Sequence, residues 1–243
     1  MHDTVRLGRL RGVPIGVNWS LLAIIVFLGF GLAGNRLPVD VPGRTGLAYA
    51  VAGGLTAVAL IVAVLVHELG HAFVARQAGM KVDGITLSWM GGVTRIEGDA
   101  PTPGRELAIA VVGPIISLAL GGACWLARIV THAAGHHQLL AAALGWLATI
   151  NILLAAFNLL PAAPLDGGRV LHAAIWKATK DRWRAARLAS RAGIGLGVLV
   201  VAAGTVMTVQ RRNNIDGLIV AVMGWWLITA ARSEEQVAGV HRA

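Results

Sequence analysis

The chain has 243 residues, of which 56% are hydrophobic and only 14% are charged. A soluble domain of this length carries about 25% charged residues, so the composition excludes an ordinary soluble protein and indicates a polytopic helical membrane protein. The formal net charge is +9. Its basic residues lie in short loops between apolar runs, and no nucleic-acid recognition module is visible. Membrane topology and contact with the lipid bilayer therefore explain the charge better than nucleic-acid binding does.

Six apolar runs are long enough to be candidate membrane spans. The first is followed by Gly34-Asn35-Arg36 rather than by a small-residue cleavage site, so we expect a retained span and not a signal peptide. The predicted fold is an all-α polytopic membrane protein with a small membrane-associated β-hairpin after the second span. We expect one integral-membrane domain over residues 1–243, with its catalytic core at about 46–176. The candidate spans are residues 17–34, 46–76, 106–128, 138–161, 192–210 and 215–231.

The distribution of basic residues predicts the orientation of these spans. With the N-terminus inside, most of the 21 lysine and arginine residues fall in cytoplasmic segments. The outside loops hold a minority, which are Arg36, Arg44, Arg128, Arg211 and Arg212. This bias predicts that both termini are cytoplasmic.

The second span ends in a metal-ligand pattern, His67-Glu68-Leu69-Gly70-His71, after an uncharged run that begins at Thr45. Histidines at i and i+4 of a helix project from one face, so both imidazoles can reach a single zinc ion. The glutamate between them is the usual general base of zinc hydrolases. The alternative is that Glu68 extends toward Arg76, two turns further on, but that reading leaves both histidines unexplained.

A catalytic zinc site usually has three protein ligands, so a third must come from another segment. Residues 139–165 carry no charge, and the first carboxylate after them is Asp166. His71 lies about 7.5 Å of helix before Arg76, and Asp166 lies just before Arg169, so both approach the cytoplasmic leaflet. An alternative role for Asp166 is the N-cap of an amphipathic helix over residues 167–180, which need not exclude metal binding.

Pro161 and Pro164 interrupt the segment that leads to Asp166, since each removes a backbone donor and obstructs a helix. Carbonyl groups freed at membrane depth are tolerated where they line a cavity, so we expect a water-accessible cleft here. Asn158 precedes the break. Its amide has two open interpretations, a hydrogen bond to a substrate carbonyl or an interhelical hydrogen bond.

A β-hairpin is predicted between residues 82 and 98. Residues 85–90 favour a strand, Gly91-Gly92 predicts the turn, and residues 93–96 favour a second strand. Two placements stay open, a surface hairpin on the cytoplasmic side or one whose apolar tip, Trp89 and Met90, dips toward the site.

The HELGH sequence, the glycine hairpin and the run from Asn158 through Asp166-Gly167-Gly168 together resemble the site-2 protease family, over about residues 60–170. These are polytopic zinc metalloproteases that cleave transmembrane segments. The resemblance implies that one Zn²⁺ ion per chain is bound by His67, His71 and Asp166, with Glu68 as base and Asn158 near the scissile carbonyl. It also implies that a strand near the cleft pairs with unwound substrate, over Trp89, Met90, Gly91, Gly92 and Val93.

Gly113-Pro114 resembles a further motif of the same family. Ser117 stands where many members have asparagine, so we assign Ser117 no catalytic role.

The chain is similar to the compact six-span branch of this family, because no insertion of PDZ-domain length is present. Members of that branch often carry cytosolic CBS domains after the last span. The sequence stops at Ala243, about where such domains would begin, so either the protein lacks them or the sequence ends before them. The resemblance implies regulated intramembrane proteolysis of a single-span regulatory protein, for example an anti-sigma factor, in a bacterial or archaeal plasma membrane.

The competing function is a membrane zinc transporter or a metal-sensing scaffold. Transport would need ligands strung along a path through the membrane, whereas His132, His136 and His137 fall in a predicted outside loop. A serine protease is disfavoured because no G-x-S-x-G-like element occurs. An aspartyl mechanism would need two intramembrane aspartates, and Asp166 is the one that qualifies. The sequence does not indicate the oligomeric state.

Overall fold

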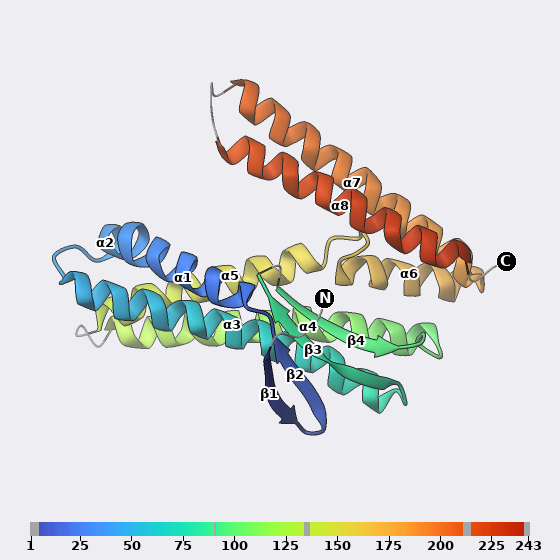
Figure 1. Ribbon diagram of the computed structural model, residues 1–243, viewed down its shortest axis with the longest axis horizontal. Coiled ribbons are helices and arrows are strands. Elements are labelled where there is room, and N and C mark those ends of the chain that lie inside the picture. Colours follow the sequence, from blue (N-terminus) through green and yellow to red (C-terminus); the bar gives the residue numbers. More distant parts are fainter. Residues whose placement is uncertain (1–4, 90, 134–136, 211–214, 241–243) are drawn as a thin grey trace. The chain divides into compact units, whose positions relative to one another are not determined.

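The computed structural model describes residues 5–89, 91–133, 137–210 and 215–240. Its chain divides into two compact units, Met1–Asp99 with Val112–Ala156 and Ala100–Val111 with Phe157–Ala243. The predicted single domain over the whole chain stays a prediction. Figure 1 labels the strands and the α-helices. The elements are β1 Val5–Leu10, β2 Val13–Val17, α1 Ser20–Gly31, a π-helical turn Leu32–Arg36, α2 Leu37–Asp40, α3 Gly46–Gln77, β3 Lys81–Ser88, β4 Gly91–Glu97, α4 Pro103–Ala133, α5 Gln138–Asn158, α6 Asp166–Thr179, α7 Arg182–Gln210 and α8 Ile215–Val240.

Five segments of the described chain are long and apolar enough to cross a membrane. They are Ser20–Asp40, Gly46–Gln77, Pro103–Ala133, Gln138–Asn158 and Arg182–Gln210. Each corresponds to one of the first five predicted spans. The sixth predicted span falls in α8, a helix that is not among these five segments, so a count of six stays a prediction.

Helix α3 carries the HELGH sequence and organises the first unit. Thr45 caps its start, because the Thr45 hydroxyl accepts a hydrogen bond from the Ala48 amide at 3.2 Å. The helix then runs for 32 residues to Gln77 and is followed by Gly79, whose φ of +83° is a left-handed conformation that favours glycine. The metal-ligand pattern therefore lies two to three turns before the end of a continuous helix.

A four-stranded sheet of order β1-β2-β3-β4 packs against α3 in the same unit. Strands β1 and β2 form an antiparallel hairpin, β2 pairs in parallel with β3, and β3 pairs antiparallel with β4. The buried side chains Ile85 and Leu87 of β3 contact Ala72 of α3 and Leu21 of α1 in one apolar cluster. The sheet is thereby fixed to the end of α3 that carries the histidines.

Local sequence patterns predict only half of this sheet. Strands β1 and β2 are not among the predicted elements, and residues 5–17 fall in a predicted cytoplasmic segment. Their turn is Arg11-Gly12, in which both residues have positive φ, 48° and 82°. An arginine at the first position of a two-residue turn differs from the Asn-Gly and Asp-Gly pairs that are typical of such turns. The parallel pairing of Ile15 with Ile85 is also non-local, so no local pattern could reveal it.

The predicted hairpin over residues 82–98 is confirmed, but the predicted turn is wrong. Gly91 and Gly92 already belong to β4, where they pair with Ser88 and Leu87. The connection therefore lies between Ser88 and Gly91. Gly91 has a φ of +112°, so the glycine permits the entry of the chain into the strand and does not form the tip.

In the second unit, the predicted break between two helices is confirmed. Helix α5 ends at Asn158 and α6 begins at Asp166. A Cβ atom at Gly167 would collide with the backbone of Leu159 and Leu160, and one at Gly168 would collide with the backbone of Ala163. The two glycines therefore let the first turn of α6 fold tightly against the proline-containing loop. Asp166 is the first residue of this helix, so the close packing holds its backbone in place.

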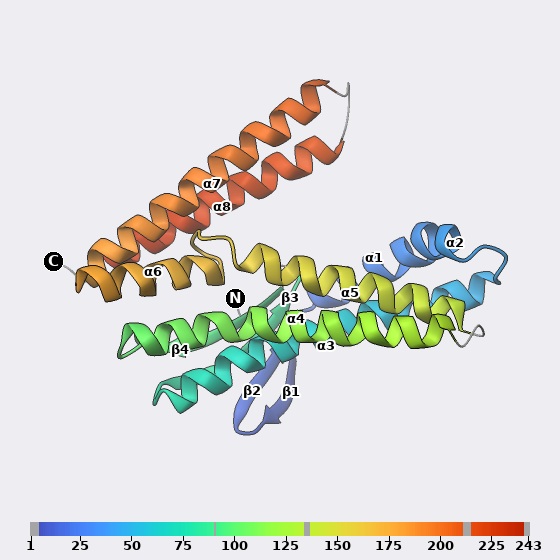
Figure 2. The same ribbon diagram turned by 180° about the vertical axis from the view of Figure 1, so that it is seen from behind.

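The alternative role of Asp166 as an N-cap is wrong. Leu165 occupies the N-cap position, and no side-chain cap hydrogen bond is made there. Beyond α6, helices α7 and α8 lie antiparallel and side by side (Figures 1 and 2). Small residues permit this contact, since a Cβ at Gly224 would lie 2.6 Å from the Val201 amide nitrogen.

Candidate metal centre

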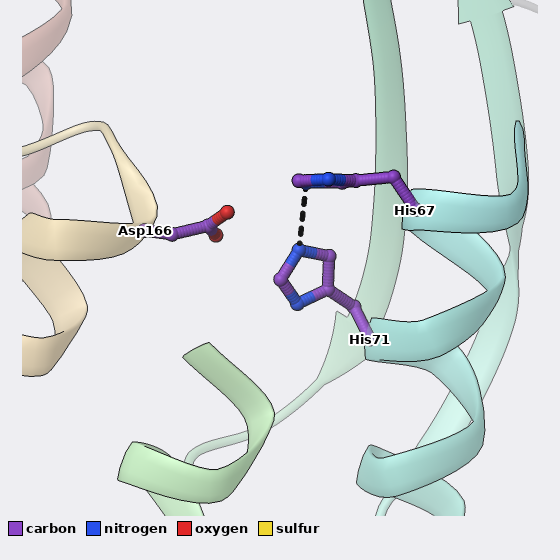
Figure 3. Close-up of side chains that lie close together, drawn as sticks. All are labelled: His67, His71 and Asp166. Carbon is purple, nitrogen blue, oxygen red and sulfur yellow. Dashed lines mark hydrogen bonds between the residues drawn. The ribbon is translucent and has the colours of Figure 1, made fainter. Parts of the chain in front are cut away.

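His67 and His71 lie one helical turn apart on the buried face of α3. Both side chains are almost completely buried, at 4% and 5% exposure. Their Nε2 atoms lie 3.2 Å apart, as the dashed line in Figure 3 marks. Two nitrogen ligands of a tetrahedral zinc ion, each about 2.05 Å from the metal, lie about 3.3 Å from one another. The histidine pair is thus arranged as one edge of a tetrahedral site.

Ser117 of α4 contacts the first of these histidines. The Ser117 hydroxyl lies 2.8 Å from His67 Nδ1, and Ser117 is fully buried. When Nδ1–H donates to this hydroxyl, the lone pair of His67 is left on Nε2, the nitrogen that faces His71. A hydrogen bond from the second nitrogen commonly fixes the tautomer of a metal-binding histidine. The sequence assigns Ser117 no catalytic role, and this contact with His67 gives Ser117 an orienting role.

The space in front of the two Nε2 atoms is kept open by Gly113 of α4. A Cβ atom at position 113 would collide with His71 Nε2 and would lie 2.5 Å from His67 Nε2. These separations are close to zinc–nitrogen bond lengths, so a side chain here would occupy the metal position. Gly70, inside the HELGH sequence, permits the same close approach from the other helix, because its Cβ would collide with Ile116. Neither glycine was assigned to the site from the sequence.

Glu68, between the two histidines, is half-buried and contacts strand β4. Its Oε2 atom accepts a hydrogen bond of 2.7 Å from the Thr94 hydroxyl, which also lies 3.2 Å from the Glu68 backbone carbonyl. The proposed extension of Glu68 toward Arg76 is wrong, since the Arg76 guanidinium donates instead to the Arg11 carbonyl. Gly92 lies directly against Glu68, because a Cβ at Gly92 would be 2.9 Å from Glu68 Cδ.

The third predicted ligand meets the histidine pair. Ligand atoms of His67, His71 and Asp166 all lie within 4.8 Å of one another, and the Asp166 carboxylate points toward the two imidazoles in Figure 3. Two imidazoles and one carboxylate are a ligand set that catalytic zinc uses. With the Nε2 spacing and the space at Gly113, these residues fit a zinc ion. Within the described residues, no second group of three such side chains occurs.

The other predicted site residues are less closely defined. Asn158 is the last residue of α5 and is half-buried, and its role at a scissile carbonyl stays a prediction. Trp89 and Val93 are exposed, at 59% and 52%, on the β3–β4 hairpin. Met90 lies outside the described residues. Substrate contacts of the hairpin therefore stay predictions, while Gly92 has an observed contact with Glu68.

The family model for peptidase family M50 matches residues 55–133 and 127–201 of the chain. Together these matches cover more than half of the sequence and include both HELGH and Asp166. The chain belongs to peptidase family M50, and with its apolar helices it is an integral membrane protein.

Curated relatives match nearly the whole of this chain. Rip3 of Mycobacterium tuberculosis is 40% identical over 97% of the chain and 59% of its own length. A Synechocystis protein is 35% identical over 99% of the chain and 62% of its own length. The names of both describe them as zinc metalloproteases. The chain thus spans about three-fifths of the length of these relatives.

Among solved structures, the fold is similar to that of the site-2 protease from Methanocaldococcus jannaschii. The TM-score is 0.60 at 23% sequence identity, and the match covers 95% of this chain and 94% of that one. At this identity the likeness defines the fold. The compact arrangement without a PDZ-sized insertion agrees with the predicted branch.

Proposed function

We propose that the chain is a zinc-dependent intramembrane endopeptidase that cleaves the transmembrane segment of a membrane-anchored regulatory protein. The observation that carries this proposal is that a carboxylate able to act as general base lies beside a space large enough for a metal ion. Glu68 lies between two histidines whose Nε2 atoms are 3.2 Å apart, and Gly113 leaves the space in front of them empty of side chain. The names of the curated relatives support the same chemistry.

His67, His71 and Asp166 would hold one zinc ion per chain. When bound, zinc supplies Lewis acidity that polarises a carbonyl group and activates water. The protein groups carry out the proton transfers. Glu68 takes a proton from the attacking water and later delivers it to the leaving amine. Asn158 donates a hydrogen bond to the scissile carbonyl oxygen as negative charge develops there.

A peptide bond inside a helix hides its carbonyl, so a substrate helix must unwind before it is cleaved. We propose that the unwound segment lies along β4 near Trp89, Met90, Gly91, Gly92 and Val93. Strand β4 is the last strand of the sheet, and its outer edge faces no further strand in the described part of the chain. Addition of a strand supplies affinity through main-chain hydrogen bonds and places little demand on side-chain identity.

We further propose that both termini are cytoplasmic and that the site opens toward the cytoplasmic leaflet of a bacterial or archaeal plasma membrane. A single-span protein of the anti-sigma-factor type is the proposed substrate class. The basic residues support this orientation. Arg9, Arg76 and Lys81 lie at the sheet end of the first unit, where the positive-inside rule expects the cytoplasm.

The test is hydrolysis of a synthetic single-span peptide by the purified chain in liposomes, with zinc measured by elemental analysis. We expect one zinc per wild-type chain and cleavage within the span. Glu68→Gln should abolish cleavage and keep the zinc, whereas Asp166→Ala should lose most of it. A fully active Glu68→Gln chain, or an Asp166→Ala chain with unchanged zinc content, would contradict the proposal. Zinc uptake into the liposomes without proteolysis would indicate a transporter.

A further inference from the structure

We propose that Thr94 is a positioning residue for Glu68, and that it links the binding of a peptide along β4 to the alignment of the general base. This inference rests on the proposed function. The starting observation is that the Thr94 hydroxyl is the hydrogen-bond partner of the Glu68 carboxylate among the described residues, at 2.7 Å. The sequence alone does not single out Thr94, because a threonine in a strand is ordinary.

The position of Thr94 in the sheet makes the contact specific. Thr94 pairs with Ile85 and Gly92 pairs with Leu87, so these four residues share one face of the hairpin. Ile85 and Leu87 are buried against α3 in the apolar cluster. Thr94 is thus a polar side chain on the face that packs on α3, and its hydroxyl is satisfied by Glu68.

Gly92 brings the strand backbone to the same carboxylate. A Cβ at this position would collide with Glu68 Cγ, so the absence of a side chain lets β4 pass directly over Glu68. The base is consequently held between its own helix and a strand. Thr94 adds a directional hydrogen bond to that contact, which limits the rotamers that the carboxylate adopts.

The same strand is where a substrate would bind. Because β4 is the edge strand, a peptide that adds to its outer side would form hydrogen bonds to the β4 backbone. Those bonds would restrict the motion of the backbone from which Thr94 reaches Glu68. Binding of peptide to the strand would then narrow the positions of the base, so part of the binding energy appears in the rate of the chemical step.

The first test compares Thr94→Val with Thr94→Ser, using the single-span peptide in liposomes. Valine keeps the shape of threonine and removes the hydroxyl, whereas serine keeps the hydroxyl. We expect Thr94→Val to lower kcat about tenfold with unchanged zinc content, and Thr94→Ser to restore most of it, as for a hydrogen bond to a charged group. The matched control is Thr86→Val. Thr86 lies on β3, and its hydroxyl contacts Arg95 and not Glu68, so kcat should stay within about twofold of wild type.

The second test examines the link to the strand. N-methylation of alternate backbone amides in the peptide removes donors that pair with β4. In the wild type it should raise KM and lower kcat, while in Thr94→Val it should raise KM alone. Equal loss of kcat in both chains would overturn the link, and a wild-type kcat in Thr94→Val would overturn the positioning role. Failure of the wild type itself to cleave would instead contradict the proposed function.

Discussion

At the scale of single residues, position 113 decides whether a metal has room. The nitrogen atoms of His67 and His71 converge on the point where a side chain at 113 would begin. A ligand set is therefore insufficient by itself, because the opposing helix must also present no Cβ. The site is defined as much by the missing atom on α4 as by the donors on α3.

Gly113→Ala should consequently bind little zinc while the helix remains intact. The added methyl group occupies the metal position, and alanine favours a helix more than glycine does, by about 1 kcal/mol. The matched control is Gly122→Ala in the same helix, where nothing lies within 4 Å of the added Cβ. Elemental analysis and thermal unfolding of both variants would check this. A Gly113→Ala chain with full zinc content would contradict the assigned metal position.

The residues that sequence reasoning found and missed differ in a physical way. Histidines at i and i+4 and a lone carboxylate after an uncharged run are visible in the sequence, because their chemistry is costly at membrane depth. Ser117 and Thr94 are small hydroxyl residues whose roles depend on which helix or strand lies opposite them. The contacts of Ser117 and Thr94 arise from tertiary packing, so no local sequence pattern predicts them.

At the scale of elements, the break between α5 and α6 was predictable because proline acts on its own helix. The turn of the β3–β4 hairpin was misplaced because two adjacent glycines are a turn signal. Here Gly91 instead permits a positive φ at the start of β4, and Gly92 permits the close approach to Glu68. The β1–β2 hairpin was missed because its parallel partner is about 70 residues away in sequence, between Ile15 and Ile85. Elements whose conformation is set by neighbouring residues were predicted, whereas strands stabilised by pairing with residues far away in the sequence were not.

Helix α6 is tied to its neighbours by His172, and this contact stabilises the helix that Asp166 begins. His172 Nδ1 lies 2.8 Å from Glu106 of α4, and Nε2 lies 3.2 Å from the Arg182 carbonyl of α7. Each ring nitrogen of His172 thus lies within hydrogen-bond distance of an oxygen atom on a neighbouring helix. The side chains of His172 and Glu106 are nearly buried, at 12% and 10% exposure.

Glu106→Leu alone should therefore be destabilising, by about 2 kcal/mol, since it leaves a nearly buried ring nitrogen of His172 without its hydrogen-bond partner. The double variant Glu106→Leu with His172→Leu should lose less than the sum of the two single losses. Chemical denaturation of the detergent-solubilised chains would measure the coupling. The Glu106→Leu variant should also bind zinc more weakly in chelator competition, because α6 carries Asp166. Additive losses would show that the two side chains act independently.

At the scale of the whole molecule, the two ends of the first unit carry different chemistry. The sheet end has Arg9 and Lys81 exposed, and an ion pair with Glu97 at 2.8 Å raises the pKa of Lys81. At the other end of α3, Arg44 contacts Gln138 at the start of α5 through a 3.4 Å hydrogen bond. Segments predicted to be cytoplasmic thus meet around the sheet, and two segments predicted to be outside meet around Arg44. The contacts within this unit therefore group its segments into the same two ends that the positive-inside rule predicts.

This division predicts which residues face the cytoplasm. Cys124 is the single cysteine of the chain, so Cys124→Ala provides a background for introduced thiols. In intact bacterial cells, a membrane-impermeant maleimide should label Arg44→Cys and Gln138→Cys. It should label Arg9→Cys and Lys81→Cys only after the membrane is opened, because these exposed positions lie at the sheet end of α3. Labelling of Arg9→Cys in intact cells would reverse the orientation and place the Glu68 end of α3 at the outer leaflet. Equal labelling of all four variants in intact cells would mean that α3 does not span the membrane.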